Sequence, residues 1–209
     1  LEIARSFAKE YSSIIALNGR NLKKLKKASL NFKNVILEKG DISDIKVAKK
    51  VSKSVLRKLG GLDILVCNVG SGKSSKPGKE NYLDWEKSLK SNFFSAINII
   101  NETKKALIKS KGCIVCISSI CGIEYVEGAP ITYSVAKSAL NSFVKFYSKV
   151  LGPKGVRINA IAPGNIMFKG STWDKKIKKN KSKALSTIYK KVSLKKFGTA
   201  KNISDICLF

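Results

Sequence analysis

Tyr133 and Lys137 carry groups that can transfer or steer a proton, and they stand four residues apart in the segment Tyr-Ser-Val-Ala-Lys. In a helix this spacing places the phenol and the ammonium group on one face. The 209-residue chain has six Tyr, and 41 of its residues are Lys or Arg, so chance alone predicts about one such pair. The pair therefore indicates a catalytic site only where the surrounding sequence supports it.

The residues that the chain lacks narrow the chemistry further. It contains no histidine, which excludes Ser-His-Asp and Cys-His catalysis and the common zinc hydrolase sites. A proton transfer near neutral pH must then use another group with a shifted pKa. We therefore expect no metal site.

Cysteine usage predicts reduced thiols in a cytoplasmic protein, because the number is odd and no signal peptide precedes it. The five are Cys67, Cys113, Cys116, Cys121 and Cys207. Cys113 and Cys116 form a C-x-x-C motif inside Gly-Cys-Ile-Val-Cys-Ile, which predicts a strand. Positions three apart in a strand point to opposite faces, so we expect core packing from this pair and no shared metal or disulfide.

The net charge of +27 raises the question of nucleic-acid binding. Only four of the basic residues are Arg, the residue that phosphate and base recognition favours. The Lys residues are spread along the predicted helices, which indicates solvated faces. We expect no specific nucleic-acid partner, although salt-sensitive adhesion to polyanions follows from the charge. No apolar run approaches the ~20 residues of a membrane span.

Short apolar runs alternate with longer helical patterns along the chain. The runs are Ser13–Leu17, Val35–Leu37, Leu62–Cys67, Cys113–Ser118 and Val156–Ile161, and the helical patterns are Asp44–Leu59, Tyr82–Lys109 and Thr132–Leu151. Asp44 or Ser43 can cap the first helix, and Gly60-Gly61 ends it. This alternation predicts one α/β domain over residues 1–209, a three-layer, doubly wound parallel sheet.

Polar clusters follow the predicted strands, at the edge where such sheets bind ligands. They are Asn18–Asn21, Asp41, Asn68–Gly72, Ser118–Ser119 and Pro163–Asn165. Asn92 lies in the helix that precedes Ser118-Ser119, and Val156–Gly164 follows the Tyr133 helix. In this order and spacing the set resembles the classical short-chain dehydrogenase/reductase family over essentially the whole chain. The resemblance implies a Rossmann-like fold and hydride transfer between a nicotinamide and a carbonyl or alcohol.

The resemblance assigns a role to each catalytic position. It makes Tyr133 the general acid/base, Ser119 the residue that orients the substrate oxygen, and Lys137 the cation beside the phenol. Asn92 matches the fourth catalytic residue, which keeps a water-linked proton path to the lysine. Because a free phenol ionises only near pH ~10, the expectation is that Lys137 and an oxidised nicotinamide lower the pKa of Tyr133.

Cofactor contacts are implied in the same way. The resemblance assigns the adenine edge to Asp41 and Ile42, the nicotinamide ribose to Lys137 and the nicotinamide carboxamide to Ile166. It gives further cofactor contacts to Asn68, Gly70, Tyr133, Pro163 and Gly164. Gly19 and Arg20 stand where NAD-preferring members carry an acidic residue, so NADP is expected ahead of NAD. Arg20 as an ordinary solvated loop residue is the alternative. Phe168 replaces the usual Thr that contacts the nicotinamide amide.

The resemblance also implies that the fold is incomplete at both ends. The family's first strand and glycine-rich phosphate loop are absent, and Leu1–Tyr11 resembles the helix that would follow them. A sheet without its central strand is expected to expose apolar faces and to bind cofactor poorly. Ser171–Lys196 resembles the mobile substrate lid, and homodimers or homotetramers are implied. The main alternative function is a catalytically silent dinucleotide-binding or regulatory protein of the same fold.

Overall fold

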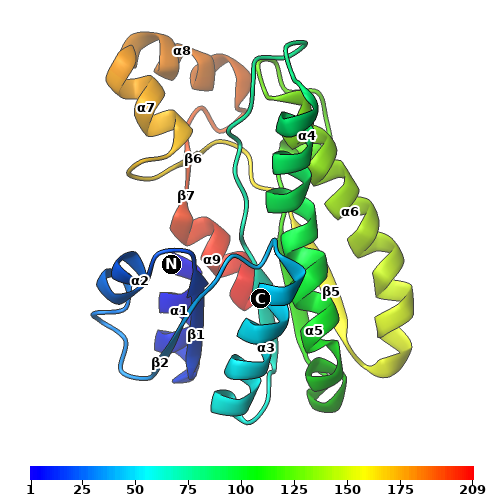
Figure 1. Ribbon diagram of the computed structural model, residues 1–209. Coiled ribbons are helices and arrows are strands. Elements are labelled where there is room, and N and C mark those ends of the chain that lie inside the picture. Colours follow the sequence, from blue (N-terminus) through cyan, green and yellow to red (C-terminus); the bar gives the residue numbers. More distant parts are fainter.

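Five parallel strands form the framework, and they lie within two residues of the apolar runs that predicted them (Figure 1). The computed structural model describes all 209 residues. The strands are β1 (Ile15–Gly19), β2 (Val35–Lys39), β3 (Ile64–Cys67), β4 (Cys113–Ile117) and β5 (Arg157–Ile161). A short parallel pair, β6 (Ile166–Met167) and β7 (Gly198–Thr199), follows.

Helices connect the strands and cover both faces of the strand layer. They are α1 (Glu2–Tyr11), α2 (Leu22–Ala28), α3 (Ile45–Leu59), α4 (Tyr82–Leu89), α5 (Ser95–Ser110), α6 (Ile131–Leu151), α7 (Thr172–Lys179), α8 (Lys181–Lys191) and α9 (Ala200–Leu208). The Asp44 side chain caps α3 by accepting from the backbone N–H groups of Lys46 and Val47, and Gly60 ends that helix with φ 76°. Both helix-end signals are thereby confirmed.

The strands do not form one continuous sheet. β1 pairs with β2, and β3, β4 and β5 form a separate three-stranded sheet. The expected α/β layering is confirmed, but the division between β1 and β3 leaves each of these strands with an unpaired edge. This division corresponds to the first strand that the resemblance expects and residues 1–209 do not supply.

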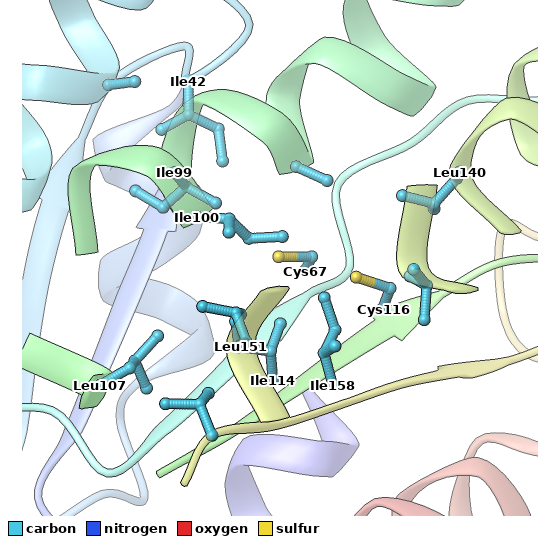
Figure 2. Close-up of a cluster of buried hydrophobic side chains, with 14 of the residues drawn as sticks. Ile42, Cys67, Ile99, Ile100, Leu107, Ile114, Cys116, Leu140, Leu151 and Ile158 are labelled. Carbon is cyan, nitrogen blue, oxygen red and sulfur yellow. The ribbon is translucent and has the colours of Figure 1, made fainter. Parts of the chain in front are cut away.

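The main core lies between the three-stranded sheet and helices α3, α5 and α6 (Figure 2). Ile100, Leu107 and Ile114 are completely buried there, and the Cys67 and Cys116 side chains lie beside each other. A smaller cluster on the opposite face centres on Phe7, and Cys113 packs against it. Cys113 and Cys116 therefore point to opposite faces, which confirms the strand-based prediction. All five cysteines are free thiols.

None of the nine α-helices combines the length and the apolar character that a membrane crossing requires.

Candidate active site

Asn92 lies in a π-helical turn, Lys90–Phe94, that interrupts the single helix predicted over Tyr82–Lys109. Such turns widen a helix by one residue and often occur at functional sites. The Asn92 side chain is 1% exposed. Its Oδ1 accepts from the Ser71 N–H at 2.8 Å, and its Nδ2 donates to the carbonyls of Ser71 and Ser88, both at 3.0 Å. Asn92 therefore fixes the loop that follows β3.

Gly70 brings that loop into contact with two of the predicted catalytic residues, Asn92 and Lys137. A Cβ at this position would stand 2.7 Å from Asn92 Oδ1 and 3.4 Å from Lys137 Nζ. Any side chain would collide with the Asn92 oxygen, so the close approach requires glycine. Three residues that are 22 and 45 positions apart in sequence thus meet at one point.

Lys137 is 4% exposed, and its Nζ donates to the Ile117 carbonyl at 2.6 Å, at the end of β4. Burial lowers the pKa of Lys137 to about 8, against opposing effects of Cys116 and Cys67. Hydrogen bonding to Cys116, together with burial, raises the pKa of Cys67, so this thiol is neutral near pH 7. The lysine consequently lies beside the neutral Cys67 thiol and has no carboxylate partner.

Tyr133 lies one turn before Lys137 on α6, with Lys137 Nζ 5.9 Å from the centre of its ring. Burial raises the pKa of Tyr133; a hydrogen bond with Ser119 opposes this shift, and Cys121 adds to it. The expected lowering of this pKa by Lys137 and an oxidised nicotinamide is therefore not seen in the protein without cofactor. The reason is that removing the phenol from water outweighs any stabilisation of its anion.

Ser119 is 8% exposed and caps a short 3-10 turn, where its Oγ accepts from the Cys121 N–H at 3.2 Å. The next part of this turn is packed against α6. Gly122 has no room for a Cβ, which would lie 2.7 Å from the Lys137 carbonyl carbon. Its carbonyl accepts from Ser138 Oγ at 2.8 Å and Asn141 Nδ2 at 3.1 Å. These contacts hold Ser119 beside the Tyr133 helix, and sequence reasoning did not identify them.

The Pro163-Gly164 segment lies against the same turn. The Ile120 N–H donates to the Pro163 carbonyl at 3.1 Å, and Ile120 side-chain atoms come within 3.8 Å of a Cβ position on Gly164. Ile166 follows in β6, where it pairs with Gly198. Trp173 of α7 donates through Nε1 to Asn165 Oδ1 at 3.0 Å, which ties the segment predicted as the substrate lid to this loop.

Arg20 and Asp41, predicted separately as cofactor contacts, are neighbours at the carboxyl ends of β1 and β2. Arg20 Nη1 lies 3.7 Å from Asp41 Oδ2, and the Arg20 side chain is 81% exposed. Burial opposes ionisation of Asp41, but hydrogen bonds from Ser43 and the Arg20 charge hold its pKa below the usual value. Asn98 of α5 donates to the Ile42 carbonyl at 3.1 Å. Arg20 and Asp41 make no contact with Asn92, Ser119, Tyr133 or Lys137.

The two groups of residues fit the two ends of a nicotinamide dinucleotide. At one end, the exposed Arg20 guanidinium can take a phosphate, and Asp41 lies beside it. At the other, side-chain-free Gly70 leaves backbone open next to the Lys137 ammonium. The glycine-rich turn that would hold the pyrophosphate between them is not among residues 1–209. Asn68, also predicted to contact cofactor, is exposed at the end of β3.

Chemically, the site combines a half-buried phenol, a hydroxyl beside it and a buried ammonium group. Such an arrangement can deliver a proton to an oxygen while stabilising the charge that develops on that oxygen.

The chain is similar to a known protein family and to several characterised proteins. The family model described as enoyl-(acyl carrier protein) reductase matches residues 1–209. Nodulation protein G of Azospirillum brasilense is 34% identical over 139 residues, 66% of this chain and 56% of that protein. A 3-oxoacyl-[acyl-carrier-protein] reductase of Rickettsia typhi is 31% identical over 212 residues, 99% of this chain and 82% of that protein.

A crystal structure of L-sorbose reductase from Gluconobacter frateurii, complexed with NADPH and L-sorbose, superposes with a TM-score of 0.91 at 25% identity. The superposition covers 100% of this chain and 83% of that chain. The aligned regions span only 56%, 66% and 62% of the length of three of the curated relatives.

Proposed function

Because the chain belongs to the short-chain dehydrogenase/reductase family, we propose that it is an oxidoreductase that interconverts a carbonyl and an alcohol with NADP(H). The observation that carries the proposal is the meeting of Asn92, Gly70 and Lys137 at one point, with Tyr133 and Ser119 on the adjoining turn and helix. Relatives with names such as 3-oxoacyl-[acyl-carrier-protein] reductase and isoepoxydon dehydrogenase carry out this type of interconversion, which supports the class.

In the reducing direction, Tyr133 gives its phenolic proton to the substrate oxygen. Ser119 donates a hydrogen bond to the same oxygen and stabilises the negative charge that develops on it. The nicotinamide, when bound, supplies the hydride that the substrate carbon accepts. The raised pKa of Tyr133 keeps the phenol protonated at neutral pH, which suits this direction.

Lys137 and Asn92 assist Tyr133 by stabilising its phenolate and by allowing it to regain a proton. The Lys137 ammonium favours the phenolate that remains after proton transfer, since the two groups share one helix face. It is also placed to bind the nicotinamide ribose. Asn92 holds the backbone at Gly70 and Ser71 close to the lysine, and we propose that this arrangement maintains a water-linked proton path from the lysine toward solvent. Reprotonation of Tyr133 would follow this path after each turnover.

Arg20 supports NADP as the cofactor. Its guanidinium is exposed and lies 3.7 Å from Asp41, so it partly neutralises that carboxylate and would offer a cation to the 2′-phosphate of NADP. Exposed apolar residues on α6, among them Phe146 at 71% exposure, support self-association through this helix. We assign residues 171–196 as the substrate lid.

Transfer of label from NADPH to product tests the function directly. The purified protein is incubated with NADPH deuterated at the nicotinamide C4 and a panel of ketones, sugars and 3-oxoacyl thioesters. The expected result is an alcohol product that carries one deuterium on the former carbonyl carbon. Saturable NADPH binding without any labelled product would instead favour the catalytically silent alternative. Binding that falls steeply with salt for NADPH and unrelated polyanions alike would reduce the site to nonspecific charge.

A further inference from the structure

Ser119 lies in a short segment, residues 117–122, that helix α6 holds at both ends. At the start of the segment, Lys137 Nζ donates to the Ile117 carbonyl at 2.6 Å. At its end, the Gly122 carbonyl accepts two hydrogen bonds from other side chains of α6. Lys137 has a role in the proposed reaction, whereas the two donors at the far end have none so far.

These two donors are Ser138 and Asn141. Ser138 Oγ lies 2.8 Å from the Gly122 oxygen, and Asn141 Nδ2 lies 3.1 Å from it. A carbonyl oxygen has two lone pairs, so the two donors satisfy it completely. Ser138 is exposed, and water can therefore replace its hydroxyl, whereas Asn141 is half-buried. The loss of Asn141 is consequently the harder of the two to compensate.

The Gly122 backbone also packs directly on the backbone of α6. A Cβ at this position would lie 2.7 Å from the Lys137 carbonyl carbon and 2.8 Å from Lys137 Cβ. The segment and the helix are therefore in van der Waals contact, and the two directional hydrogen bonds set where along the helix this contact is made.

Asn141 lies on the same side of α6 as the predicted catalytic pair. Tyr133, Lys137 and Asn141 follow one another at intervals of four residues, and residues at this spacing are neighbours on a helix surface. One stripe of α6 thus carries the phenol, the lysine and a donor that fixes the end of the segment. The position of Ser119 relative to Tyr133 is then set by a single rigid helix.

The hydroxyl of Ser119 is oriented from within the segment. Its Oγ accepts from the Cys121 N–H at 3.2 Å, which occupies a lone pair and leaves the O–H free to donate. In the proposed reaction this O–H hydrogen-bonds the substrate oxygen. Cys121 directly precedes Gly122, so a shift of the Gly122 peptide also moves the N–H group that orients the hydroxyl.

From these contacts we infer that Asn141, assisted by Ser138, is a positioning residue of the proposed reaction. The two side chains act through Ser119: by holding the Gly122 carbonyl, they keep its hydroxyl where it meets the substrate oxygen. The inference rests on the proposed function, because it concerns that reaction. Loss of one donor to a developing oxyanion costs about 10²–10³-fold in kcat, which sets the upper limit of the effect.

Alanine variants measure the effect, with NADPH and the carbonyl substrate that the deuterium transfer identifies. We expect kcat to fall about threefold in Ser138→Ala, about tenfold in Asn141→Ala and about 30-fold in the double variant, since small displacements of a catalytic group are costly. The Kd for NADPH should stay the same. Ser138→Thr keeps the hydroxyl and should keep kcat. The matched control is Ser148→Ala, which removes an α6 hydroxyl that donates to the Lys145 carbonyl of its own helix, and it should leave kcat unchanged.

A double-mutant cycle with Ser119→Ala separates positioning from a general loss of structure. Where the Ser119 hydroxyl is already absent, the Ser138→Ala/Asn141→Ala pair should cost less than about threefold in kcat. Equal costs in the two backgrounds would overturn the inference, as would an unchanged kcat in the double variant. If the double variant does not fold, Ser138→Ala, at its exposed position, goes through the same cycle, with a loss of about threefold expected against none.

The two proposals fail in different ways. A wild-type protein that forms no labelled product contradicts the proposed function itself. A wild-type protein that turns over, with a cycle in which the costs simply add, contradicts only the role of Asn141 and Ser138.

Discussion

The half of the molecule that carries Tyr133 and the half that carries Arg20 differ in how firmly their site residues are held. Asn92, Ser119 and Lys137 are each less than 10% exposed and are anchored by hydrogen bonds to the three-stranded sheet or its loops. Arg20 and Asp41 belong to a two-stranded pair in which no strand residue is buried, beside α2, which buries none either. The catalytic half is therefore pre-organised on its own, whereas the nucleotide half depends on what joins it to the rest.

Removal of the proton donor is expected to have the largest effect on the catalytic half. Tyr133→Phe keeps the ring but loses the hydroxyl, so kcat should fall by about 10²–10⁴-fold, the usual contribution of general acid catalysis. NADPH affinity should change little, because the nucleotide half is untouched. Steady-state rates and cofactor titration by fluorescence measure the two quantities. A loss of only a few-fold in kcat would remove Tyr133 from its assigned role.

Alanine variants of two asparagines, Asn92 and Asn98, test how strongly each half of the molecule is anchored. Asn92→Ala removes the bond to the Ser71 N–H and the buried bond to the Ser88 carbonyl, and we expect a loss of about 2–4 kcal/mol in the free energy of unfolding. Asn98→Ala removes only half-buried bonds to the Ile42 and Ser43 carbonyls and should cost about 1 kcal/mol. Urea denaturation measures both. Equal costs would mean that the halves are anchored equally.

The burial of Lys137 predicts a stability gain on its removal. The folded pKa of about 8 lies below the ordinary 10.5, so between these values the unfolded chain binds more protons and stability rises with pH. Lys137→Met should therefore be more stable than the wild type by about 1–2 kcal/mol at pH 7, after loss of the Ile117 hydrogen bond, although inactive. The advantage should shrink toward pH 10. Urea denaturation from pH 6 to 10 follows it, and a gap that grows with pH would contradict the assigned shift.

The smallest expected effect lies in the nucleotide half. Arg20→Ala removes the cation proposed for the 2′-phosphate, so the Kd for NADPH should rise about tenfold while that for NADH stays the same. The exposed ion pair with Asp41 contributes little, so the free energy of unfolding should change by less than about 0.5 kcal/mol. Calorimetric titration with both cofactors provides the comparison. A parallel loss for NADH would make Arg20 a general contact.

Sequence patterns predicted the elements well where a local signal exists. The Asp44 cap and the Gly60 end of α3 are local hydrogen-bond and backbone signals, and both are confirmed. The π-helical turn at Asn92 escaped prediction, because the apolar periodicity of residues 82–109 is that of one continuous helix. The need for glycine at position 70 was equally hidden, since it arises from an Asn92 oxygen 22 residues away.

By itself, the sequence determined which residues can perform the chemistry: the lack of histidine, the Tyr133–Lys137 spacing on one helix face and the strand alternation that separates Cys113 from Cys116 are all local properties. Tertiary structure alone decided how those groups behave. It partly buried Tyr133 and buried Lys137, so that the pKa of the phenol rises and that of the ammonium falls. It also divided the strands between β1 and β3. The pKa shifts and the division of the strands both depend on segments that are distant in sequence. These segments exclude water or pair backbone groups, so no single stretch of sequence predicts either result.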